Sequence, residues 1–115
     1  MHKDVETVLS GIKVDGKGVP FAHIKFTKQA SLYITYQFLN ERPELCADDL
    51  PETSVVEVDI DIYSRSRNGL IAAQSEILTA FIGAGWTWVE LSPEMYEEDT
   101  KLIHRTVTFE KERMI

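Results

Sequence analysis

The stretch that decides the fold is Val55-Val56-Glu57-Val58-Asp59-Ile60-Asp61-Ile62-Tyr63, in which apolar and acidic residues alternate. In a β-strand, successive side chains point to opposite faces of the sheet. The alternation therefore predicts a strand over residues 55–63 whose even-numbered positions, from Val56 to Ile62, face the core. Glu57, Asp59 and Asp61 are expected on the opposite face.

Two further strands are expected upstream of this one. Residues 19–26 have a β-rich composition, and Pro20 fits at the start or on a sheet edge because proline cannot donate to a ladder. Residues 31–39 alternate as a second strand with aromatic side chains on both faces, so we expect a partner to cover one face. Residues 40–54 carry two prolines and five acids, which predicts a long loop with a functional role or mobility.

Two helices complete the expected elements. Residues 4–12 place apolar side chains at helical spacing. Residues 64–69 supply turn and N-cap chemistry, and a helix follows to about Ala84. Its expected apolar stripe contains Leu70, Ile71, Ile77, Leu78 and Phe81, with Ala73 and Ala80 beside it. Strands are expected at 86–91 and 101–111, with an acidic loop at 92–100 between them.

The order is then helix, strand, strand, long loop, strand, helix, strand, strand. Two closely spaced strand pairs favour antiparallel pairing, with both helices on one face. The sequence therefore predicts an α+β fold, a two-layer single domain over residues 1–115 with a mostly antiparallel sheet of four to five strands. A chain of 115 residues is long enough for one modest core.

Composition excludes several classes of protein. Twelve basic and 19 acidic side chains give a net charge of -7. A dedicated nucleic-acid binder needs Lys and Arg to replace phosphate counterions, so sequence-specific binding is not expected. No apolar run approaches the roughly 20 residues of a membrane span, and the acidic N-terminus does not resemble a secretory signal. The single cysteine, Cys46, allows no internal disulfide and suits a reducing compartment.

The row Glu57, Asp59 and Asp61 is the first candidate site. Its carboxylates are expected roughly 7 Å apart, so they could bind a hard cation or divide acid and base roles. No histidine stands at matched spacing on the strand, and we favour the solvated face of a half-buried strand. A second acidic cluster, at 94–99, lacks the spacing of an EF-hand and is expected to be a hairpin loop.

No catalytic residue, metal site or cofactor is predicted. Cys46 could act as a nucleophile only beside a base, and His23 and His104 are far from it in the sequence. Trp86 and Trp88 share a strand face and suit either the core or an interface, and the sequence leaves both open.

Basic and acidic segments are candidates for contacts between subunits. Arg65 and Arg67 form the one local basic spot, and arginine suits paired contacts with carboxylates. Alternatively, these two arginines are simply solvent-exposed residues at the start of a helix. Complementary contacts of this kind fit a ring assembled head to tail. The interface candidates are Arg65 and Arg67 on the basic side and, on the acidic side, Glu44, Asp48, Asp49, Glu97, Glu98 and Asp99.

Several motifs together resemble a known family. These are the strand Leu32-Tyr33-Ile34-Thr35-Tyr36-Gln37, the strand from Val56 to Ser64, and Asn68 before an apolar helix. They continue with Gly85-Trp86, Tyr96-Glu97-Glu98-Asp99 and Leu102-Ile103-His104-Arg105. Over roughly residues 19–112, this run is similar to the tail completion, or tail-to-head joining, proteins of long-tailed phages and prophages.

The resemblance implies a structural subunit with no enzymatic activity and no cofactor. Such a subunit is a monomer or a weak oligomer when free. On assembly it forms a ring, often a hexamer, at the head-proximal end of the tail tube, where it meets the tube protein and the head connector. It implies a location in the virion neck, and in the host cytoplasm during assembly. Glu57, Asp59 and Asp61 would then face the pore, where like charge keeps DNA from adhering.

Two other functions stay open from the sequence. One is a head-closure or connector adaptor of the same virion neck. The other is a small cytoplasmic enzyme that uses the face of Glu57, Asp59 and Asp61.

Overall fold

The computed structural model describes residues 2–26, 30–44 and 53–114, with side chains for 3–26, 30–39 and 54–112. Two helices and eight strands are described in this part of the chain. In order they are α1 (His2–Ser10), β1 (Lys13–Val14), β2 (Lys17–Gly18), β3 (Phe21–His23), β4 (Leu32–Glu44), β5 (Thr53–Ser64), α2 (Arg67–Gly83), β6 (Thr87–Leu91), β7 (Met95–Glu97) and β8 (Leu102–Met114).

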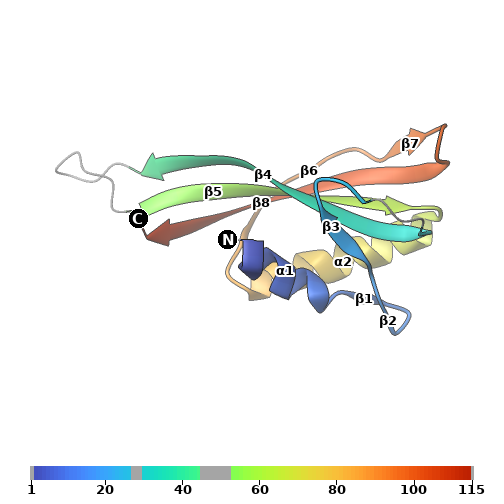
Figure 1. The fold of residues 1–115 in the computed structure, drawn as a ribbon, viewed down its shortest axis with the longest axis horizontal. Coiled ribbons are helices and arrows are strands. Elements are labelled where there is room, and N and C mark those ends of the chain that lie inside the picture. Colours follow the sequence, from blue (N-terminus) through green and yellow to red (C-terminus); the bar gives the residue numbers. More distant parts are fainter. Residues whose placement is uncertain (1, 27–29, 45–52, 115) are drawn as a thin grey trace.

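The fold is α+β with two layers, as the sequence predicts. β5 lies at the centre of a sheet with the order β3-β4-β5-β8-β6, and β7 pairs with β8 beyond the end of β6. Both helices cover one face of this sheet, and β4, β5 and β8 extend past them toward the left of Figure 1. The sheet therefore has six strands instead of four to five, because the 92–100 segment adds the short β7.

The core lies between the helices and the sheet. The even-numbered residues Val58, Ile60 and Ile62 of β5 are fully buried, as their alternation predicts. α2 buries one stripe against them, consisting of Leu70, Ala73, Ile77 and Phe81. Val5 and Leu9 of α1 and Phe109 of β8 belong to the same cluster.

Two details of the expected α2 stripe change. Ile71 is 40% exposed and does not belong to the core, because it lies on the flank of the helix away from the sheet. Gln74, which interrupts the apolar pattern, accepts a hydrogen bond of 3.0 Å from Nη1 of Arg105 on β8. Its amide is thus partnered across the two layers.

The first strand pair is parallel, and the expected antiparallel pairing is wrong there. β3 and β4 run in the same direction, with Phe21 opposite Ile34 and His23 opposite Tyr36. Ile24 has φ 66°, in the left-handed region, where the chain turns away from the strand. Parallel strands cannot be joined by a tight hairpin turn, and strand spacing alone does not reveal this arrangement. The second pair, β6 with β8, is antiparallel as expected.

The expected loop over 40–54 is wrong at both ends. β4 continues to Glu44 and β5 begins at Thr53, and the two are paired in register there after a bulge between Phe38 and Asn40. Beyond Tyr36, β4 has no second neighbour within the described residues, and an edge position tolerates Pro43. The rest of the expected loop, residues 45–52, lies outside the described residues.

Candidate functional site

The face of the sheet away from α1 and α2, called here the open face, carries the acidic row. Glu57, Asp59 and Asp61 lie on this face of β5, and each is half-buried between the neighbouring strands. Glu90 of β6 belongs to the same face, because it lies opposite Thr108, which in turn lies opposite Asp59. Carboxylates from two strands thus gather on one surface.

Hydroxyls of β8 hold two of these carboxylates. Thr108 donates a hydrogen bond of 2.6 Å to Oδ1 of Asp59. Thr106 donates one of 2.5 Å to Oδ1 of Asp61, and Nε2 of His104 lies 3.1 Å from the same oxygen. Hydrogen bonds to an ionised acceptor are stronger than those between neutral groups. These bonds therefore offset part of the free-energy cost of burying the two carboxylates. Sequence reasoning missed these partners, because they come from a strand more than 40 residues away.

Negative charge on Asp59 is disfavoured by its surroundings. Burial raises the pKa of Asp59, and the neighbouring carboxylates of Asp61, Glu90 and Glu57 raise it further. The hydrogen bond from Thr108 acts in the opposite direction and is outweighed. Asp59 therefore takes up a proton more readily than an exposed aspartate does.

An aromatic stack borders the acidic row. The rings of Phe26, Tyr33, Tyr63 and His104 lie face to face across the sheet, with successive centroids 4.5, 4.7 and 4.3 Å apart. Burial raises the pKa of Tyr63 to about 12, and the charge of Asp61 contributes to this rise. The sequence showed the aromatic character of both faces of β4, but it did not show the stack, which depends on register.

The two histidines considered as partners of Cys46 lie on opposite faces of the sheet. His104 stacks on Tyr63 on the open face, whereas the ring of His23 lies 5.0 Å from that of Tyr36 on the helix-covered face. Cys46 lies outside the described residues. Among the residues that are described, no group of three or more His, Cys, Asp or Glu side chains could hold a metal ion.

The basic corner formed by Arg65 and Arg67 lies beside acidic residues of its own chain. Nε of Arg67 lies 3.2 Å from Oε1 of Glu94, and the Arg67 side chain is 65% exposed. Arg65 lines a cleft of about 420 Å³ together with Asp99 and Tyr33. The basic corner and the 94–99 segment are therefore neighbours within one subunit.

The other interface candidates lie in different places. Glu97 ends β7, and Glu98 and Asp99 are exposed in the turn before β8. Glu44 is the last residue of β4. Asp48 and Asp49 lie outside the described residues.

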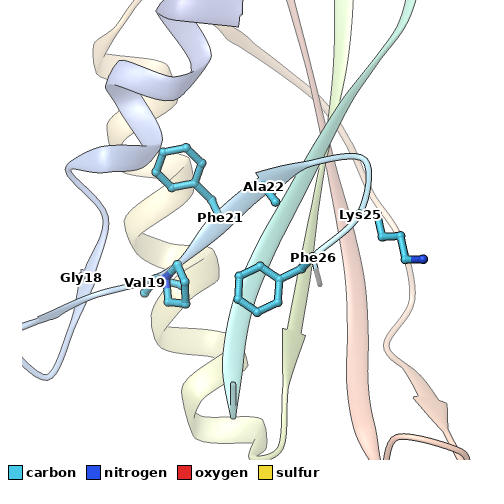
Figure 2. A pocket seen from close by; sticks show the side chains of 7 residues that line it. Gly18, Val19, Phe21, Ala22, Lys25 and Phe26 are labelled. Carbon is cyan, nitrogen blue, oxygen red and sulfur yellow. The ribbon is translucent and has the colours of Figure 1, made fainter. Parts of the chain in front are cut away.

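A second cleft, called here the β3 slot, lies along the edge of the sheet and was not expected from the sequence. It has a volume of about 580 Å³ and is lined mainly by apolar residues, including Val19, Pro20, Phe21 and Phe26, with Lys25. Figure 2 shows the Phe21 and Phe26 rings projecting from different parts of the slot and the Lys25 chain extending away from them at its rim.

The two tryptophans have different environments. Trp86 is buried against Phe81, with ring centroids 5.9 Å apart. Trp88, on the edge strand β6, is 47% exposed. One indole thus belongs to the core and the other to the surface.

Comparison with known proteins adds no family: no family model matches this chain, and no curated protein matches it. Neither helix in the described part of the chain has the length and apolar character needed to cross a membrane.

Proposed function

We propose that this chain is a structural subunit of a long-tailed phage neck, a tail completion or tail-to-head joining protein. Its copies form a ring at the head-proximal end of the tail tube, between the tube protein and the head connector. The observation that carries the proposal is the open face, on which the row of Glu57, Asp59 and Asp61 is not covered by either helix. The motifs that resemble the tail completion family support the same function.

An acidic surface of this kind is suited to the wall of a DNA conduit. Phosphates carry one negative charge per about 1.7 Å of duplex, so a wall of the same sign prevents the genome from adhering during its passage. The carboxylates gain fixed positions from the threonine hydroxyls of β8, which keep the charge on the surface of a rigid sheet.

The test is deletion of the gene in a phage or inducible prophage that carries it, followed by complementation in trans. The expected result is an accumulation of full heads and unjoined tails in electron micrographs, with joined virions restored by the wild-type gene. A normal yield of joined virions after deletion would overturn the proposal. Cross-linking to portal protein instead of tube protein would identify the head-closure adaptor, the nearest alternative.

A second candidate function is an enzyme that uses the same carboxylates. The raised pKa of Asp59 favours it, because a carboxyl with this property is suited to general acid work. Divalent-metal binding by the wild-type protein, or an enzymatic activity that is lost in Asp59→Asn with Asp61→Asn, would favour the enzyme over the structural subunit.

A further inference from the structure

The two edges of the sheet carry unlike surfaces. β3 forms one edge and β6 lies at the other. The β3 edge presents the β3 slot, a concave and mainly apolar surface with Lys25 at its rim. The β6 edge presents the exposed side chains of Trp88 and Val89, which are 47% and 48% exposed, next to Glu90.

The Trp88 side chain has the properties of an interface anchor. Its Nε1 donates a hydrogen bond of 3.1 Å to the backbone oxygen of Glu90, so covering the indole would leave no unsatisfied donor. The same bond fixes the ring beside the bulge between Trp88 and Glu90 and lowers the entropy cost of docking. Tryptophan is also among the residues that most often dominate the energy of an interface.

Strand directions allow the two edges to meet. β6 runs antiparallel to β8, β8 to β5 and β5 to β4, while β3 runs parallel to β4. β6 and β3 therefore run in opposite directions. If two copies lie side by side in the same orientation, the β6 of one copy meets the β3 of the next as an antiparallel neighbour, the commoner arrangement in sheets.

The faces of the sheet match as well. Trp88 lies opposite Phe109, and Phe21 lies opposite Ile34. Phe109 and Ile34 are fully buried under the helices, so Trp88 and Phe21 belong to the helix-covered side of the sheet. When the helix-covered sides of two adjoining copies face the same direction, the indole of one copy reaches the slot of the other on the side where Phe21 lies.

Charge complements this apolar contact. Glu90 lies on the open face, where its carboxylate repels that of Asp59. Lys25 is exposed at the rim of the slot and brings a positive charge to the opposite edge of the sheet. A lysine from the next copy would relieve the repulsion between Glu90 and Asp59 while it draws the two edges together.

We propose that the β6 edge of one copy docks in the β3 slot of the next copy, with Trp88 as the apolar anchor and Glu90 facing Lys25. The contact joins unlike surfaces, so it is head-to-tail and closes into a ring when the rotation permits. It rests on the ring proposed above and names its interface. β3 has only three residues, so backbone pairing is short and the side chains supply most of the affinity.

Charge reversal tests this contact with the free protein. Lys25→Glu and Glu90→Lys are each expected to weaken self-association about tenfold. The same loss is expected for Trp88→Ala. The control variants are Lys3→Glu and Glu76→Lys, which change exposed residues on α1 and α2 that line neither the slot nor the β6 edge, and are expected to have no effect. The measurement is sedimentation velocity over a series of protein concentrations, with circular dichroism to verify folding.

A mixture of the two reversed variants gives the decisive result. In the mixture, the glutamate that Lys25→Glu places in the slot of one copy meets the lysine that Glu90→Lys places on the edge of the other. The contact made in the reverse order keeps its natural charges, so association is expected to return. Each variant alone has only like charges at the contact. Mixed variants that stay as weakly associated as the separate ones would overturn the proposal.

Disulfide trapping covers the case of an association too weak to sediment. In a Cys46→Ser background, Lys25→Cys mixed with Glu90→Cys is expected to form a mixed disulfide dimer faster than either variant alone. Equal rates in all three samples would also overturn the proposed contact. Neither assay uses phage, so the interface and the proposed function can fail separately. If virion assembly requires the gene but the free protein does not associate through this contact, only the interface is refuted. Association through this contact with no role in tails would refute only the proposed function.

Discussion

Thr108 and Asp59 form a hydrogen bond of 2.6 Å across the β5–β8 pair, and this bond does not fully offset the cost of burying the carboxylate. Burial is the largest cause of the raised pKa of Asp59, and three carboxylates nearby add to it. The ionised form of Asp59 is therefore disfavoured by its surroundings in the folded protein.

Replacement of this charge is expected to stabilise the protein. Asp59→Asn keeps an acceptor for Thr108 and should raise the free energy of unfolding at neutral pH by less than about 1 kcal/mol, since the group is partly exposed. The pKa of Asp59 in the folded protein lies above the ordinary value of 3.8. The wild type therefore loses stability as the pH rises from 3.8 through the pKa of the folded protein. The advantage of the variant should therefore shrink as pH falls toward 3.8.

Urea denaturation of both proteins at neutral and acid pH measures this difference. Glu76→Gln, on the exposed side of α2, serves as the control for the loss of one negative charge. A gain for Asp59→Asn that stayed the same at both pH values would contradict the assignment to charge.

Tyr63 is expected to respond to its neighbour Asp61. Burial is the first cause of its pKa of about 12, and the charge of Asp61 is the second. Asp61→Asn should therefore move this pKa part of the way toward the ordinary value of 10.0. The phenolate absorbance measures the titration, with Tyr63→Phe to identify the signal of this residue. An unchanged titration would mean that the charge of Asp61 does not contribute to the shift.

Two glycines of α2 provide a matched pair for stability. A Cβ at Gly69 would lie 2.8 Å from Oγ of Ser64, and that oxygen is held by a bond of 2.8 Å to the backbone oxygen of Ser66. A Cβ at Gly83 meets nothing within 4 Å. Gly69→Ala should therefore lower the free energy of unfolding by about 1 kcal/mol, although alanine normally favours helices.

Gly83→Ala is the control, with an expected gain of up to about 1 kcal/mol from the higher helix propensity of alanine. Thermal or urea unfolding of the two variants gives the comparison. Equal gains for both variants would show that the hydroxyls of Ser64 and Ser66 move aside without cost.

The period of two in residues 55–63 was enough to predict the central strand and the placement of Glu57, Asp59 and Asp61 on one face. Contacts between distant segments could not be predicted in this way. Thr108 and His104 become partners of the acidic row only through the β5–β8 register. The parallel β3 depends on a chain reversal at Ile24, where a β-branched residue adopts a left-handed conformation that propensity disfavours. Composition also misassigned residues 40–44, because an edge strand tolerates the proline that usually indicates a loop.

Variants of Arg67 can distinguish a role within its own subunit from a role in virion assembly. Its pair with Glu94 involves a guanidinium that is 65% exposed, so Arg67→Glu should lower the free energy of unfolding by less than about 1 kcal/mol. If the corner contacts a partner in the proposed ring, the folded variant should still fail to complete tails. Phage complementation with counts of free heads and unjoined tails measures this outcome, and Lys3→Glu on α1 is the control for charge reversal.

The charge swap Arg67→Glu with Glu94→Arg then identifies the partner of this arginine. The swap restores an internal ion pair between positions 67 and 94 but leaves both charges reversed toward the outside. We expect tails to remain incomplete, because an external carboxylate would still meet the wrong sign. Restored virion yield would show instead that Arg67 acts inside its own subunit by holding Glu94, and it would remove the basic corner from the subunit interface.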